Sequence, residues 1–280
     1  MTANSLKLAC RSGLAAAVLV GGVGTAQADI FIDDSTGAIY DVDVGTRAAT
    51  LFATPDVTMR DIAFVGNVLY GIDESKLYTI DPTDPSNSTT TPVGDLASSG
   101  DNTGMNALFY DGATLFGMSF TQSDLFTIAT SGTGPLATAV GFDWDFTSEG
   151  DIEQSTTSGN LYVTTTTDGS ATSSDFNEIT KIGTTPVGGV SFDTGVNDVW
   201  GLAYFGSTLY GAAGSNLYTI DPNTTTVTDQ GTITLASGGD LEVAFGATRP
   251  VPLPAAAWLF GSAMLGMIGV GRYARKKASA

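Results

Sequence analysis

The residues of this chain that could do chemistry are almost all carboxylates. The sequence contains 29 Asp and Glu residues, no His and a single Cys, Cys10. A Ser-His-Asp or Cys-His nucleophile system therefore cannot be assembled, and zinc, copper and haem sites of the usual ligand types are excluded. Two kinds of carboxylate chemistry survive, namely a pair that acts on a glycosidic bond and a group that surrounds Ca²⁺.

One group of carboxylates lies beside a tryptophan. Its members are Asp143, Trp144, Asp145, Glu149, Asp151 and Glu153. Ca²⁺ takes several oxygen ligands at once, which this segment could supply, and the face of a Trp ring could stack on a sugar ring. The spacing matches no EF-hand loop, so an acidic connecting loop with a packed Trp accounts for the same residues. We treat the group as a candidate site for Ca²⁺ or a sugar.

A second set of polar residues recurs at one place in the sequence pattern. The residue two positions before a short apolar pair is Asp61, Asn106, Gly201 or Glu242 in four segments, and Glu153 takes this place in a poorly matching fifth. Three carboxylates and one amide would meet if the elements that carry them surround a common centre. If these elements do not, the same residues are solvated strand ends.

The elements that carry these residues form a repeat of short β-strands. The motif Leu69-Tyr70-Gly71 recurs at nearly constant spacing as Leu115-Phe116-Gly117, Leu161-Tyr162-Val163 and Leu209-Tyr210-Gly211. Each copy is preceded by one apolar run and followed by two more, with turn residues between them, which is typical of strands. Four strands in about 46 residues is the length of one β-propeller blade.

The two ends of the body complete the pattern. Segments 30–33, 38–43 and 48–53 read as strands two to four of a blade that lacks its first strand, and Leu241–Phe245 reads as a first strand with none after it. Joining them closes a ring and removes the open edges. We therefore predict an all-β, five-bladed β-propeller over residues 29–249, in which the N-terminal strands complete the last blade. A β-sandwich could use the same strands.

Residues 1–28 have the parts of a secretory signal peptide. Lys7 and Arg11 precede an apolar run, and Ala26 and Ala28 flank Gln27 in an A-x-A cleavage site. We expect the Sec machinery to export the chain and the signal to be removed. Cys10 leaves with it, so no disulfide holds the body.

Residues 250–280 form a C-terminal tail with three parts. The motif Val251, Pro252, Leu253 and Pro254 is followed by an uncharged run, 255–271, and then by Arg272, Arg275, Lys276 and Lys277. As a helix the run would span roughly 25 Å, the short end of what crosses a bilayer. The basic cluster should stay cytoplasmic, so the body should face outward.

This tail resembles the VPLPA variant of the PEP-CTERM sorting signals of Gram-negative bacteria. The resemblance is confined to the tail itself. It implies that an exosortase cuts near the Pro motif and that the body, transiently anchored in the inner membrane, is released or re-anchored at the outer surface or in the matrix. Such proteins often accompany exopolysaccharide or biofilm production. A plain membrane anchor without processing explains the same residues.

The body has a resemblance of its own. Segments 77–82 and 217–222 both read LYTIDP, which resembles the LYxIDP repeats of secreted bacterial propeller-like proteins. This resemblance implies a fold and no activity, because propellers host many functions.

The net charge of the body limits the classes of partner that it could bind. All 29 acidic residues lie in it, against five Lys and Arg, so its net charge is −24. Such a surface repels nucleic acid and favours solubility outside the cell. We predict a non-enzymatic protein that binds polysaccharide or another matrix component. The alternatives are a carboxylate-dependent glycan-active enzyme and a purely structural envelope protein. We expect no cofactor, with Ca²⁺ as the one candidate.

Overall fold

The computed structural model describes residues 30–97, 104–141, 146–155, 157–166, 175–179 and 191–249. These residues form 21 β-strands and no helix, so none of the described chain could cross a membrane as a helix. Several predicted features lie outside the described residues. These are the cleavage site Ala26 and Ala28, the loop 142–145 with Asp143, Trp144 and Asp145, the motif 251–254, the helix 255–271, and the basic cluster Arg272, Arg275, Lys276 and Lys277.

Four of the five sheets have four strands each, connected in chain order. The first contains β4 (Asp61–Val65), β5 (Val68–Ile72), β6 (Lys76–Asp81) and β7 (Thr89–Asp95). The second contains β8 (Met105–Tyr110), β9 (Leu115–Ser119), β10 (Leu125–Ile128) and β11 (Ala137–Ala139). The third contains β12 (Thr147–Gln154), β13 (Leu161–Thr166), β14 (Asp175–Ile179) and β15 (Ser191–Asp193). The fourth contains β16 (Val199–Phe205), β17 (Thr208–Ala213), β18 (Asn216–Asp221) and β19 (Thr226–Thr232).

The fifth sheet is built from both ends of the described chain. Its strands, in spatial order, are β20 (Thr234–Leu235), β3 (Ala48–Ala53), β2 (Ile39–Val42), β1 (Ile30–Asp34) and β21 (Ala244–Thr248). The predicted pairing of the two ends is therefore present, with β21 antiparallel to β1. The last strand begins at Ala244, later than predicted. Leu241 instead follows a turn and is buried in the core, and β20 adds a parallel strand outside β3 that the sequence pattern did not indicate.

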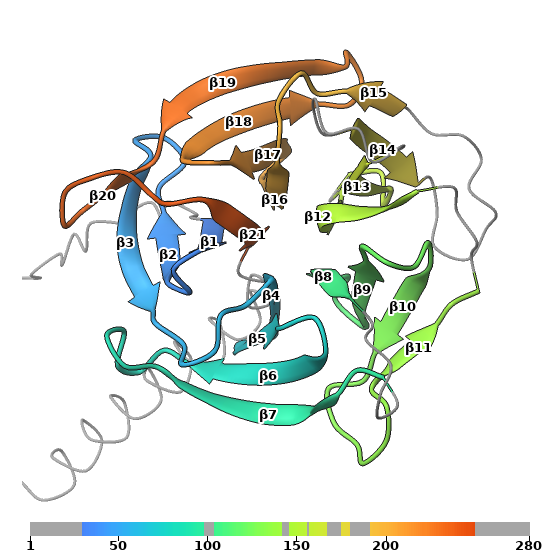
Figure 1. The fold of residues 1–280 in the computed structure, drawn as a ribbon. Coiled ribbons are helices and arrows are strands. Elements are labelled where there is room, and N and C mark those ends of the chain that lie inside the picture. Colours follow the sequence, from blue (N-terminus) through green and yellow to red (C-terminus); the bar gives the residue numbers. More distant parts are fainter. Residues whose placement is uncertain are drawn as a thin grey trace, which may run out of the picture.

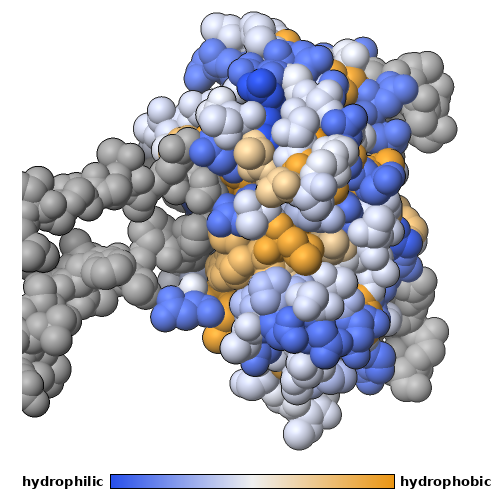
Figure 2. All heavy atoms as spheres, turned by 90° about the vertical axis from the view of Figure 1, so that its left-hand side faces the viewer, coloured by the Kyte–Doolittle hydropathy of each residue, from blue (hydrophilic) through white to orange (hydrophobic). Residues whose placement is uncertain are grey.

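The sheets stand in a ring, as in a β-propeller (Figure 1). Strands β4, β8, β12, β16 and β21 are innermost, and each contacts the next around the ring. The all-β, propeller-like prediction is confirmed, and the alternative of two packed sheets is wrong. The side of the ring at β3 is mostly polar, with an apolar band across its middle (Figure 2).

The aromatic residues of the repeated motif pack between sheets. Tyr70, Phe116 and Tyr162 are buried, while Tyr210 is half-buried. Tyr162 lies 6.2 Å, ring centre to ring centre, from Tyr204 of the next sheet. These contacts join neighbouring sheets through apolar side chains, which is how a ring of sheets buries its faces.

The glycine of the motif is explained by the strand that follows it. A Cβ on Gly117 would lie 2.7 Å from Cδ1 of Ile128, and one on Gly211 would lie 2.9 Å from Cδ1 of Ile220. In these two sheets the isoleucine of the third strand therefore fills the space beside the glycine of the second. Close packing of this kind is costly to disturb, because neither side has room for another methyl group.

Candidate functional site

The centre of the ring is occupied by two carboxylates that accept backbone N–H groups from all five innermost strands. Asp61 accepts hydrogen bonds from the N–H of Ile62 at 2.7 Å and of Leu108 at 2.5 Å. Asp151 accepts from Ile152 at 2.6 Å, Leu202 at 2.5 Å and Ala247 at 3.1 Å. The five donors hold equivalent positions, because each residue pairs with the third residue of the motif or its counterpart Ile32.

Asp61 and Asp151 also form a hydrogen bond with each other, and neither has any exposed surface. Burial raises the pKa of both carboxyl groups well above their usual range, and the charge of Asp151 raises that of Asp61 further. The hydrogen bond from Asp61 acts in the opposite direction on Asp151. The shared hydrogen bond raises the pKa of Asp61 and lowers that of Asp151, so Asp61 is the more readily protonated of the two. With every oxygen engaged, the pair closes the centre of the ring.

Small residues on the other inner strands make room for this pair. The positions equivalent to the two aspartates are Ala107, Gly201 and Gly246, each one residue before its N–H donor. A Cβ on Gly246 would overlap the Asp61 carboxylate and lie 2.7 Å from Oδ1 of Asp33. Two of the five equivalent positions thus carry an aspartate and three carry Ala or Gly, so the two aspartate side chains fit together at the centre.

Asp33, on β1, is a third carboxyl group beside this pair. It is 1% exposed, and within the described part of the chain neither of its oxygens has a hydrogen-bond partner. Burial, with a smaller contribution from the charge of Asp34, raises the pKa of Asp33 to about 8, although nearby backbone N–H groups and Arg60 oppose the shift. Asp33 is therefore mostly protonated at neutral pH.

A fourth buried carboxylate, Glu153, lies two residues beyond Asp151 on β12. Its Oε1 is 3.3 Å from Nη2 of Arg249. Burial raises the pKa of Glu153 to about 7, against the opposing charge of Arg249. Arg249 is the last described residue, so this ion pair holds the end of the described chain against β12.

The five residues that precede the central positions surround a cavity of about 240 Å³. They are Arg60, Asn106, Gly150, Trp200 and Phe245, and Glu74, Phe120 and Glu149 complete the lining. We call this space the mouth cavity, because its lining residues come immediately before the central residues on the innermost strands. Gly150 is required there, since a Cβ would overlap the backbone of Trp200.

The mouth cavity has an aromatic side. The ring centres of Trp200 and Phe245 are 5.4 Å apart, and Phe120, which lines the same cavity, is 44% exposed. The Arg60 guanidinium carbon lies 5.5 Å from the centre of the Phe245 ring, in cation–π distance. An aromatic surface of this kind can stack on the flat apolar face of a ligand.

The polar side of the cavity carries planar hydrogen-bonding groups. Nη2 of Arg60 is 2.6 Å from Oε1 of Glu74. Asn106 is 7% exposed and donates through Nδ2 to the carbonyl oxygen of Ser148 at 3.2 Å, while its Oδ1 has no partner among the described residues. A buried acceptor without a donor is costly, so this atom is a candidate acceptor for a ligand hydroxyl.

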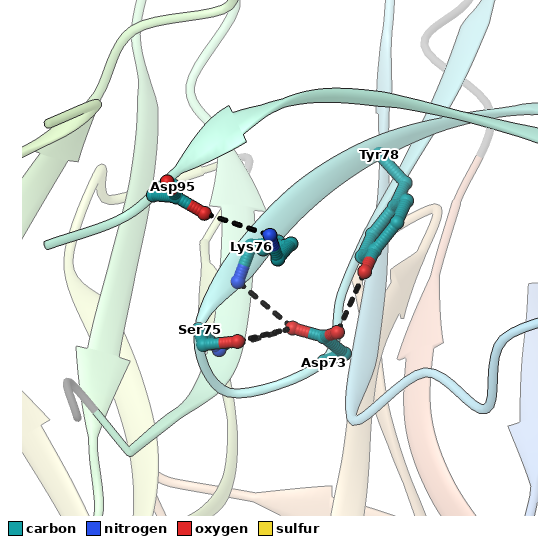
Figure 3. A network of polar contacts seen from close by, with 5 residues as sticks. All are labelled: Asp73, Ser75, Lys76, Tyr78 and Asp95. Carbon is teal, nitrogen blue, oxygen red and sulfur yellow. Dashed lines mark hydrogen bonds and ion pairs between the residues drawn. The ribbon is translucent and has the colours of Figure 1, made fainter. Parts of the chain in front are cut away.

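Glu74 lies in a tight turn between β5 and β6, and Figure 3 shows the contacts of the neighbouring Asp73. Asp73 accepts hydrogen bonds from the N–H of Ser75 and Lys76, at 3.1 and 2.8 Å, and from the hydroxyl of Tyr78 at 2.7 Å. Burial would raise the pKa of Asp73, but these hydrogen bonds together lower it. The turn holds Glu74 at φ 84°, a left-handed conformation that side chains rarely adopt. The carboxylate of Glu74 is thereby directed toward Arg60.

The candidate site residues predicted from the sequence lie in three different environments in the structure. Asp61 and Asp151 lie at the centre, and Glu153 is buried two residues beyond Asp151, because the position equivalent to Asp61 belongs to Asp151 and not to Glu153. Asn106 and Glu149 line the mouth cavity instead. Glu242 is exposed and precedes β21, so its predicted place in the ring is wrong and belongs to Gly246. Among the described residues, no group of three or more His, Cys, Asp or Glu could hold a metal ion.

Sequence reasoning missed Asp33, Arg60, Glu74, Phe120, Trp200 and Phe245. A usable signal existed for some of them. Arg60, Asn106, Trp200 and Phe245 are separated by roughly one or two repeat lengths, so a complete alignment of the first strands would have placed them together.

Comparison with known proteins supports the fold. No protein-family model and no curated protein matches the chain. A chain in the crystal structure of the nidogen/laminin complex is similar over 80% of this chain and 98% of its own length, with a TM-score of 0.51 and 11% identity. A protein of unknown function from Bacteroides caccae matches over 72% of each chain, with a TM-score of 0.42 and 10% identity. At 11% identity the likeness to the nidogen/laminin chain concerns the propeller-like fold alone.

Proposed function

We propose that this protein is an exported, non-enzymatic polysaccharide-binding propeller and that the mouth cavity is its binding site. The observation that carries the proposal is the pairing of an aromatic surface, Trp200 and Phe245, with the unpartnered acceptor of Asn106. Sugar rings have apolar faces and hydroxyl edges, so a site for them needs both kinds of surface. In this proposal the five-stranded sheet is the fifth blade of the ring.

The central carboxylates have a structural role in this proposal. A glycosidase needs two carboxyl groups that reach the scissile bond from either side. Asp61 and Asp151 have no exposed surface, and their oxygens accept the N–H groups of the inner strands. They hold the ring together beneath the cavity and leave recognition to the residues above them.

Localisation is the second part of the proposal. Residues 1–28 direct Sec export, and residues 250–280 form an exosortase-type sorting signal whose helix, 255–271, crosses the inner membrane with the C-terminus in the cytoplasm. Support comes from the order of the Pro motif, apolar run and basic cluster in the sequence. The body then acts at the outer surface or in the extracellular matrix, where its strong negative charge keeps it soluble.

The test is retention of the exported protein on the exopolysaccharide of its own host. The protein is purified in a detergent without a sugar head group, so that detergent does not compete. We expect retention to be lost in Trp200→Ala and kept in Tyr218→Ala, which removes a half-buried aromatic residue from β18. Equal retention of the two variants would contradict the assignment of the site. Repeating the assay with Ca²⁺ and with EDTA tests whether Ca²⁺ bridges the ligand.

A further inference from the structure

We infer that the mouth cavity binds the terminal residue of an uncharged glycan chain, and not an internal stretch or an acidic sugar. This inference rests on the proposed function and adds the class of ligand. Three observations carry it, namely the size of the cavity, its closed floor and the charges around it.

The size and the floor of the cavity favour a chain end. Its volume of about 240 Å³ is below the range of roughly 300–1,000 Å³ that is usual for drug-sized ligands, so it suits a single sugar ring. The residues lining it directly precede the central positions, where the hydrogen-bonded pair of Asp61 and Asp151 fills the ring. A polysaccharide therefore cannot thread through the centre. It can enter only with a terminus.

The charges favour an uncharged ligand. Glu149 and Glu74 line the cavity, and the single cation of the lining, Arg60, is already within 2.6 Å of Glu74 and stacked on Phe245. A uronate would meet Glu149 without gaining a free cation, because Arg60 is already paired with Glu74. An acidic sugar is therefore opposed by a like charge that a neutral sugar avoids.

Asn106 is the residue that fixes the orientation of the terminal sugar. Its Nδ2 donates to the carbonyl oxygen of Ser148, which holds the amide in place, and its Oδ1 is the acceptor that we assign to a sugar hydroxyl. Trp200 supplies the face on which the ring rests. The lining thus offers one oriented acceptor and one stacking surface, which is enough to bind one ring.

The experiment is calorimetric titration of the exported protein, in a detergent without a sugar head group. The first probes are the methyl glycosides of glucose, galactose, mannose and N-acetylglucosamine, with glucuronic acid and glucosamine as the charged members. The second probes are a series of linear oligosaccharides, from the disaccharide upward, that end in the neutral sugar that binds best.

We expect a neutral glycoside to bind and glucuronic acid to bind at least about tenfold more weakly. The affinity per chain should not change with oligosaccharide length. Asn106→Ala should weaken binding about tenfold, as expected for a lost hydrogen bond in a buried site. Asn87→Ala, in an exposed turn, is the matched control and should bind like the wild type. Thermal unfolding checks that each variant is folded, and Trp200→Phe offers a milder second variant.

The possible failures are distinguishable. Affinity that rises steadily with chain length, or equal binding of glucuronic acid, would overturn the inference of a neutral chain end while the polysaccharide-binding function stands. Binding to the exopolysaccharide that Asn106→Ala and Trp200→Phe both leave unchanged would overturn the site. Absence of binding to every probe and to the exopolysaccharide would overturn the proposed function itself.

Discussion

Asp61 and Asp151 lie on different sheets, far apart in the sequence, and form one hydrogen-bonded pair at the centre of the ring. Between them they accept one backbone N–H from each of the five innermost strands. The pair therefore joins the five innermost strands to one another through two side chains, as backbone hydrogen bonds join the strands within a sheet.

Removing Asp151 should destabilise the protein more than removing Asp61. Asp151→Ala leaves three buried N–H groups without an acceptor, whereas Asp61→Ala leaves two. Each unsatisfied group costs about 1–3 kcal/mol, so we expect a loss of at least ~3 kcal/mol for Asp151→Ala. Urea unfolding of both variants measures the difference. Equal stabilities would show that the two carboxylates do not divide the donors as described.

The isosteric variants test where the proton lies. Asp61 is the more readily protonated partner, so Asp61→Asn keeps a donor toward Asp151 and should be the milder change. Asp151→Asn replaces the accepting carboxylate and should cost more free energy of unfolding, measured in the same urea titrations. A reversed order would place the proton on Asp151.

Asp33 should make the protein less stable as the pH rises. Its pKa is about 8 in the folded state against 3.8 for an ordinary Asp, so between these values the folded state binds the additional proton. The contribution of Asp33 to the free energy of unfolding is fully present below pH 3.8 and is lost as the pH rises toward 8. Asp33→Asn should flatten the slope of unfolding free energy against pH over this window. Urea titrations at several pH values would reveal an unchanged slope if another group is responsible.

Gly246→Ala should prevent proper closure of the ring. The added methyl group would overlap Asp61 and approach Asp33 Oδ1 to 2.7 Å, and neither buried carboxyl group can move into solvent. We expect a loss of roughly 1–3 kcal/mol or more, as for overpacked cores. Gly134→Ala is the control, because a Cβ there meets nothing within 4 Å. Similar thermal midpoints for the two variants would refute the crowding at the centre.

Replacing Pro252 and Pro254 with Ala should block processing of the C-terminal tail. An exosortase that reads the Pro motif would leave this variant uncut, so the cell-associated form should accumulate at full size. Immunoblots of cell and culture fractions follow both forms. Processing at the wild-type rate would favour a plain membrane anchor.

The sequence was sufficient for the strands, the repeat and the joining of the two ends. Repeated motifs at nearly constant spacing identify blades, and incomplete units at the ends indicate where the chain closes. The sequence pattern did not reveal the register of the first strand of each sheet, that is, which of its residues lies at the centre of the ring. A β-bulge in β8 places Asn106 one position earlier than Asp61, and a wider irregularity in β12 brings Asp151 and not Glu153 to the centre. Such bulges leave the apolar pattern unchanged, so the pattern cannot reveal them.

The mouth cavity was harder to predict for a different reason. Trp200 and Phe245 look like ordinary strand residues, and Arg60 and Glu74 look like surface charges. Most of the lining comes as single residues from separate strands, so no short segment of the chain displays the site. Glu74 depends further on a turn set by Asp73 and on a left-handed backbone, neither of which the residue type indicates.

The pairing of β21 with β1 has a consequence for the order of events during synthesis. The first strand of the body, β1, pairs with a strand that is synthesised last, at the opposite end of the body. Asp151 likewise accepts the N–H of Ala247, which is 96 residues downstream. Contacts this distant are slow to form, because the intervening chain must first be brought together. The body therefore cannot complete its fold while it is being synthesised. It stays open until its last strand emerges, and a chain that stops before Ala244 leaves β1 as an unpaired edge that other chains can join.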